Sequence, residues 1–166
     1  IRVANALDTH FDDWSSDQGP RQAAGFEVAS SIMRELDALE YKGSGKSWLD
    51  HTVIVGFSEF SRTPLINVRG GRDHSLTNAC FVAGGNIKGN QVIGASSDLA
   101  LQPTKTNLST GLSDPSGEVI RPEHVLQTLF DEVGIGERPD LRVPECRQPD
   151  IGTCSHPIAI PALLKS

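Results

Sequence analysis

The sequence of 166 residues contains no apolar run that approaches the roughly 20 residues of a membrane span, so it predicts no transmembrane helix. Its three cysteines are too few for a disulfide scaffold. Basic residues are also scarce, with 15 lysines and arginines against 21 acidic residues and a formal net charge of −6. Because non-specific binding to nucleic acids or anionic membranes usually requires a basic patch, we expect neither kind of partner.

The sequence also lacks two motifs of common catalytic folds, the Gly-x-Ser-x-Gly nucleophile elbow and the Walker phosphate loop. The glycine-rich stretch at residues 84–89 follows an apolar run, but no helical pattern begins behind it. We interpret it as a structural turn, or as a turn whose amides line the rim of a pocket. A simple doubly wound binder of small molecules is therefore the least favoured class of protein, because such folds hold phosphate at a glycine loop before a helix.

The length of the chain is that of one ordinary domain. We expect residues 1–136 to form this domain and residues 137–166 to form a proline-rich C-terminal tail. Within the tail, Cys146 and Cys154 either form a disulfide, which would suit an exported protein, or stay as two free thiols. The chain opens on a strand-like run without an initiator methionine, so we expect it to be a portion of a longer protein.

The first half of the sequence alternates between strand-like and helical patterns. Residues 2–7 and 52–57 are short apolar runs typical of buried strands, and residues 22–40 between them carry apolar side chains at helical spacing. This order predicts a right-handed βαβ unit with parallel strands, followed by a third strand at residues 78–83. The fold class that we expect is α/β, with a mostly parallel sheet and helices on both faces.

The second half of the sequence has weaker patterns. Residues 91–94 are a short candidate strand, and the polar residues 95–118 predict a long excursion or a hairpin. Residues 122–133 carry an apolar stripe at helical spacing, and Pro122 suits the first turn of a helix. We therefore expect a second helix there.

Acidic and imidazole side chains follow the predicted strands, and ligands in α/β sheets bind at the carboxyl ends of strands. Asp8 and His10 are close enough to reach one metal ion, or they are a turn residue and a surface histidine. Glu59 either binds a metal or forms a structural ion pair with Arg62. His74 follows two glycines that let backbone approach a site closely, and it binds a metal, carries a proton or is a loop histidine with neither role. Oxygen and nitrogen donors of these kinds suit hard or borderline divalent metals.

Three residues near these candidate ligands have alternative roles. Arg62 could hold an anionic group, because its planar fork matches the oxygens of phosphate or sulfate. Thr63 either caps the turn or touches a ligand. Asp73 either caps a turn or orients the neighbouring histidine.

The motifs follow one another in a fixed order: Asp8-Thr9-His10, a helix, the run from Val53 to Pro64, Gly71-Arg72-Asp73-His74, and the turn at residues 83–89. In this combination the chain resembles domain-of-unknown-function family 1501, an uncharacterised bacterial family. That family is similar to the alkaline phosphatase and sulfatase superfamily. The resemblance covers most of residues 3–135.

The resemblance implies an alkaline phosphatase-like sheet with a two-metal site at the ends of its strands. By this resemblance, zinc, manganese or calcium would be bound by Asp8, His10, Glu59 and His74. The substrate would be contacted by Arg62 and Thr63. In the relatives, the first strand and the serine or threonine nucleophile lie upstream of these motifs. The chain is therefore expected to be an incomplete domain, the C-terminal portion of such a protein.

The residues and the resemblance together predict a metal-dependent hydrolase of phosphate or sulfate esters, located in the bacterial periplasm or otherwise exported. Its expected partners are a small anionic ester and either a second copy or the missing N-terminal portion. The alternative is a non-catalytic binding module on the same fold, with a degenerate metal site and with residues 95–118 in contact with a partner.

Overall fold

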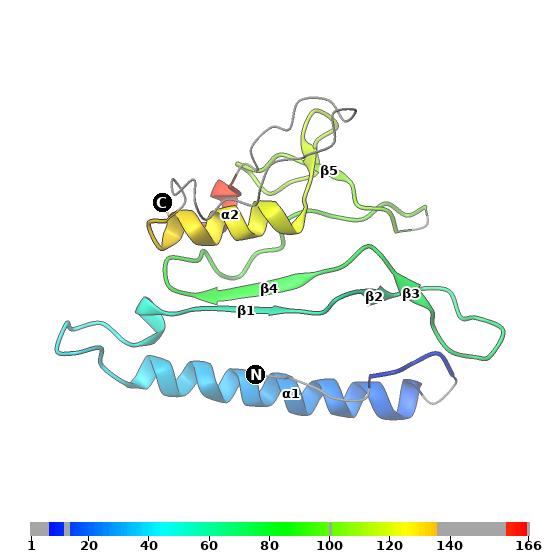
Figure 1. The fold of residues 1–166 in the computed structure, drawn as a ribbon, viewed down its shortest axis with the longest axis horizontal. Helices are drawn as coiled ribbons and strands as arrows, with labels where there is room; N and C mark the ends of the chain where they lie inside the picture. The colour runs from blue at the N-terminus through cyan, green and yellow to red at the C-terminus, as the bar shows by residue number, and fades with distance from the viewer. Residues whose placement is uncertain (1–6, 12–13, 100, 136–158, 166) are drawn as a thin grey trace. The chain divides into compact units, whose positions relative to one another are not determined.

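The computed structural model describes residues 7–11, 14–99, 101–135 and 159–165 (Figure 1). The chain divides into two compact units, of which the first ends at Gly85 and the second begins at Asn86. The described strands pair two by two, and every pair is antiparallel. Within the described part of the chain, no helix combines the length and the apolar character needed to cross a membrane.

The first unit contains one long helix, α1 (Trp14–Ala38). The sequence predicted its start near Gln22, because Gly19 and Pro20 are typical of a loop, and this boundary is wrong. The helix continues through Pro20, and an ion pair of 2.8 Å between Arg21 and Asp17 joins successive turns of its surface. Gly19 and Pro20 therefore do not interrupt the helix, although both residues are typical of turns.

The two longest strands, β1 (Val53–Phe57) and β4 (Cys80–Gly84), lie close to where the sequence predicted them. They pair with each other in antiparallel register, with Val53 opposite Gly84. A parallel pair needs a crossover connection, usually a helix. Residues 58–79 instead fold back on themselves, because two short strands within them also pair.

These short strands are β2 (Ser61–Arg62) and β3 (His74–Ser75), and Arg62 lies opposite His74. Figure 1 shows the two pairs following one another as a single long ribbon. The predicted α/β fold, a mostly parallel sheet with helices on both faces, is therefore wrong. The described chain has two α-helices and small antiparallel two-stranded sheets.

Helix α1 runs alongside this ribbon (Figure 1), and the ring of Phe26 in the helix lies 6.0 Å from the ring of Phe81 in β4. The Phe81 ring covers Gly56 of β1 so closely that a Cβ atom added there would lie 2.0 Å from it. Phe26 and Phe57 nevertheless stay exposed. Both phenylalanines line an open cavity that is also lined by Asp8, His10 and Arg62, so exposed apolar surface lies beside these polar side chains.

The second unit contains the predicted helix, α2 (Pro122–Glu132), which begins at Pro122. Its other pieces are the antiparallel pair β5 (Lys105–Thr106) with β6 (Glu118–Val119) and the 3-10 helix η3 (Pro161–Leu163). A short 3-10 helix of the first unit, η1 (Leu49–His51), precedes β1. The hairpin interpretation of residues 95–118 agrees with the β5–β6 pair, whereas the strand predicted at residues 91–94 does not form.

Among the residues that the structure describes, the core of the second unit is small and partly polar. Ile87, Ile160 and Ala162 are its buried apolar residues, and the buried Thr128 hydroxyl donates to the His124 carbonyl oxygen at 2.7 Å. The same hydroxyl accepts the backbone N–H of Ile160 at 2.8 Å, which ties α2 to the C-terminal segment. Most of the predicted strand at residues 2–7 and most of the predicted tail, including Cys146 and Cys154, lie outside the described residues.

Candidate functional site

Asp8 and His10 bind each other through a local turn. Asp8 Oδ1 accepts the backbone N–H of His10 at 3.1 Å and also contacts His10 Nδ1. This is the turn that an aspartate forms with the backbone two residues later. Thr9 between them is only 1% exposed, which anchors the segment in the first unit.

Arg62 of β2 brings a guanidinium group to the same place. Its Nη2 lies 3.6 Å from Asp8 Oδ1, and its Nη1 lies 3.2 Å from His10 Nδ1 and 3.3 Å from His10 Nε2. The guanidinium also donates to the carbonyl oxygens of Leu7, at 3.3 Å, and Arg72, at 3.1 Å. With its side chain 14% exposed, Arg62 ties together three separate stretches of chain.

The contacts assign a tautomer to His10. Because Asp8 Oδ1 can only accept, the His10 nitrogen that it touches, Nδ1, carries the proton. The Nε2 atom then accepts from Arg62. Both ring nitrogens of His10 are thus engaged, and this assignment follows from the hydrogen-bond network.

His74 of β3 completes the cluster. Its ring stacks on the Phe60 ring, with centroids 3.8 Å apart and planes at 20°, and lies 4.7 Å from the His10 ring. Glu59 lines the same open cavity of about 1580 Å³ as these histidines. The structure therefore brings Asp8, His10, Arg62 and His74 into contact and places Glu59 on the wall of the cavity they share.

Thr63 has a different place. Its hydroxyl donates to the Leu65 carbonyl oxygen at 3.0 Å and accepts the backbone N–H of Asp73 at 3.2 Å. Both bonds hold the loop between β2 and β3, and Thr63 is not among the residues that line the cavity. Of the two roles that the sequence left open for Thr63, the observed contacts are those of the turn.

The observed contacts do not fit a resident metal ion. Within the described residues, no group of three or more histidine, cysteine, aspartate or glutamate side chains is arranged to hold one. The Asp8 oxygen and both His10 nitrogens already face each other or Arg62. A cation bound to Asp8 Oδ1 or to a His10 nitrogen, at the usual ligand distances of about 2 Å, would have to displace the guanidinium or break the contact between Asp8 and His10.

The ion pair suggested by the sequence between Glu59 and Arg62 is also not present among the described residues. Arg62 pairs with Asp8 instead. Strand β2 carries its side chain towards β3 and the Asp8 turn.

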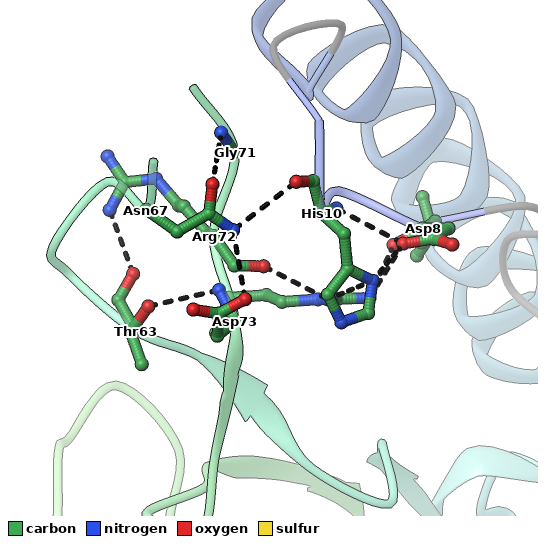
Figure 2. A network of polar contacts seen from close by, with 9 residues as sticks. Asp8, His10, Thr63, Asn67, Gly71, Arg72 and Asp73 are labelled. Atoms are coloured by element: carbon green, nitrogen blue, oxygen red, sulfur yellow. Dashed lines mark hydrogen bonds and ion pairs between the residues drawn. The ribbon is translucent and has the colours of Figure 1, made fainter. Parts of the chain in front are cut away.

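Sequence reasoning missed Asn67, which lies in the loop between β2 and β3. Figure 2 shows its amide between the His10 carbonyl oxygen, at 3.3 Å, and the Asp73 carboxylate, at 2.9 Å. Asp73 therefore takes part in the loop, in keeping with the turn role that the sequence left open. A turn-forming asparagine three residues before two glycines was the available signal, but its partner 57 residues away was not visible from local pattern.

The pKa of the Asp8 carboxyl is held below its ordinary value of 3.8, first by the hydrogen bond from the His10 side chain, then by the His10 backbone N–H, and also by the positive charge of Arg62. A lowered pKa in the folded state means that ionised Asp8 stabilises the fold above pH 3.8. This contribution is lost as the pH falls through the lowered value.

We expect His10→Ala to raise the pKa of Asp8 towards 3.8, because it removes the largest cause of the shift. A pH titration of the Asp8 carboxyl carbon by NMR measures it. Asp114 is the internal control, since its pKa is lowered by Ser116 and Asn107 and should not change. An Asp8 titration midpoint that is the same in both proteins would contradict the assigned contact.

The first unit is thus a small α+β structure in which a carboxylate, two imidazoles and a guanidinium meet at one end of an open cavity. The family model described as "Protein of unknown function (DUF1501)" matches residues 8–111, more than half of the chain, and the chain belongs to that family. The match includes every candidate residue of the site and confirms the family resemblance. No curated protein and no solved structure matches the chain.

Proposed function

We propose that this chain provides part of the site of a hydrolase that acts on phosphate or sulfate esters. The observation that carries the proposal is the meeting of Asp8, His10, Arg62 and His74, from three separate stretches of sequence, at one cavity. Guanidinium and imidazole groups bind oxyanions and transfer protons. The motif order is that of the family to which the chain belongs. The similarity that we propose between this family and the alkaline phosphatase and sulfatase superfamily supports the same reaction, although the antiparallel fold does not.

The contacts suggest a division of roles among these side chains. Arg62 supplies a fixed positive charge beside the His10 imidazole, and Asp8 holds His10 in one tautomer. The ring of His74 has Phe60 on one side and lines the open cavity, so it is the group best placed to exchange a proton with an ester oxygen. Because the donor set does not fit a metal in this arrangement, no step is assigned to one.

A second candidate function is a non-catalytic binding module. The observation that favours it is the engagement of Arg62 by Asp8, His10 and two backbone carbonyls, which makes this arginine a structural tie. The cavity would then hold an anionic ligand beside His74 without hydrolysing it.

We expect the protein, with any sequence that precedes this chain included, to hydrolyse 4-nitrophenyl phosphate or 4-nitrophenyl sulfate, and His74→Ala to lower kcat by about 100-fold, as for the loss of a general acid or base. The assay is run with and without added zinc, manganese or calcium. His51→Ala is the matched control, because His51 is exposed and does not line the cavity.

Binding of inorganic phosphate, measured by calorimetry, separates the two candidates. If the wild-type protein binds phosphate but hydrolyses neither ester, and His74→Ala abolishes the binding, the binding module is favoured. Neither binding nor turnover would overturn both. Turnover that is unchanged in His74→Ala would show that His74 takes no part in the reaction.

Export and self-association are further parts of this proposal. A disulfide between Cys146 and Cys154 would support an oxidising location, and mass spectrometry after alkylation without reduction detects it. Sedimentation at several concentrations tests self-association.

A further inference from the structure

We propose that Asn67 is a positioning residue, which fixes the backbone at His10 and thereby the direction of the His10 imidazole. Asn67 belongs to the loop between β2 and β3 and does not line the cavity. Its effect on the ring direction stands on the structure alone, and only its effect on ligand binding rests on the proposed function.

The Asn67 amide uses its full hydrogen-bonding capacity, and Figure 2 shows its bonds with His10, Gly71 and Asp73. Its Nδ2 donates to the carbonyl oxygen of His10 at 3.3 Å and to Asp73 Oδ1 at 2.9 Å. Its Oδ1 accepts the backbone N–H groups of Arg69, at 2.9 Å, and Gly71, at 3.1 Å. A primary amide has two N–H donors and two acceptor lone pairs, and here each is paired. The side chain is therefore held in one orientation.

The loop around Asn67 lies against the segment that carries His10. The backbone N–H of Arg72 donates to the Thr9 carbonyl oxygen at 2.6 Å, and Phe11 forms an antiparallel bridge with Gly70. These two contacts flank His10 in sequence, and the Asn67 bond is made at His10 itself. Because the position of the ring follows from the backbone and two side-chain torsions, fixing this carbonyl restrains where the imidazole can lie between Asp8 and Arg62.

Asn67→Asp isolates this role. The aspartate has the same shape and keeps an acceptor for the N–H groups of Arg69 and Gly71, but it loses both donors and faces the Asp73 carboxylate. In the double variant Asn67→Asp with Asp73→Asn, an asparagine at position 73 can donate to an aspartate at position 67. The swap restores the bond that closes the loop but not the bond to the His10 carbonyl.

The test is NMR of histidine labelled with 15N, with the His10 signals assigned from His10→Gln. The wild-type protein should show an Nδ1-protonated His10 ring and a nuclear Overhauser effect between the His10 and His74 rings, whose centroids are 4.7 Å apart. We expect Asn67→Asp to lose both signals. We expect the swapped double variant to recover the wild-type urea midpoint without recovering either His10 signal.

Two outcomes overturn the proposal. One is a wild-type His10 signature in Asn67→Asp, and the other is full recovery of that signature in the swapped double variant, which would make Asn67 a loop-closing residue only. Asn90→Asp is the control for the charge change, because Asn90 is exposed and has no side-chain bond among the described residues.

Titration with inorganic phosphate separates this proposal from the proposed function. If wild-type protein binds phosphate, Asn67→Asp should weaken binding by about tenfold or more, as expected for a displaced binding group. If wild-type protein does not bind phosphate, the proposed function fails, while the two His10 signals still decide whether Asn67 positions the ring.

Discussion

Replacing Arg62 with methionine is expected to lower the free energy of unfolding by about 2–3 kcal/mol, the range for losing hydrogen bonds to a charged, largely buried group. Methionine keeps the apolar stem but removes the bonds to His10 and to the carbonyl oxygens of Leu7 and Arg72. The pair with Asp8 adds little to this figure, because the Asp8 side chain is 68% exposed and the ion pair is screened by solvent.

Arg62→Lys should fall between the wild-type protein and Arg62→Met, because an ammonium group keeps the charge but not the planar fork that reaches several acceptors. Urea unfolding followed by circular dichroism measures all three. Arg34→Met is the matched control, since Arg34 is exposed on α1 and its side chain bonds, within the described part of the chain, only to the nearby Ser31 at 3.0 Å. Equal losses for positions 62 and 34 would show that Arg62 does not tie the segments together.

Gly71→Ala is expected to destabilise the first unit by about 1–3 kcal/mol, as for overpacking at a closely packed position. A Cβ atom there would lie 2.2 Å from the His10 carbonyl carbon and 2.3 Å from the Phe11 nitrogen. These are backbone atoms, which cannot rotate away as a side chain can. The segment that carries Asp8 and His10 must therefore move away from the loop.

Gly89→Ala provides a matched control for this effect. An added Cβ at Gly89 meets nothing within 4 Å, and neither glycine has a φ in the left-handed region, so the two substitutions differ in contact alone. The urea midpoint and the amide NMR signals of Thr9 and His10 are the measurements. Unchanged signals in Gly71→Ala, or an equal loss of stability in Gly89→Ala, would contradict the close approach.

The candidate residues of the site were largely predictable from the sequence, whereas their contacts were not. Asp8, His10, Arg62 and His74 were each identified because polar groups followed apolar runs or glycines, and the structure places them together. The partner of Arg62 was not identifiable, because Glu59 is its nearest acidic neighbour in sequence while Asp8 is its neighbour in space. Asn67 was missed for the same reason.

By itself, the sequence determined the helix α2, the strands β1 and β4 and the family to which the chain belongs, because apolar periodicity, a proline in a first turn and motif order are local properties. Only the tertiary structure decided that β1 and β4 run antiparallel, since this depends on whether residues 58–79 cross over or fold back. It also decided that the Arg62 guanidinium lies among the oxygen and nitrogen donors expected to bind a metal. Both the antiparallel pairing and the place of the guanidinium depend on which backbone segments pair across long stretches of chain. Local sequence patterns do not contain this information.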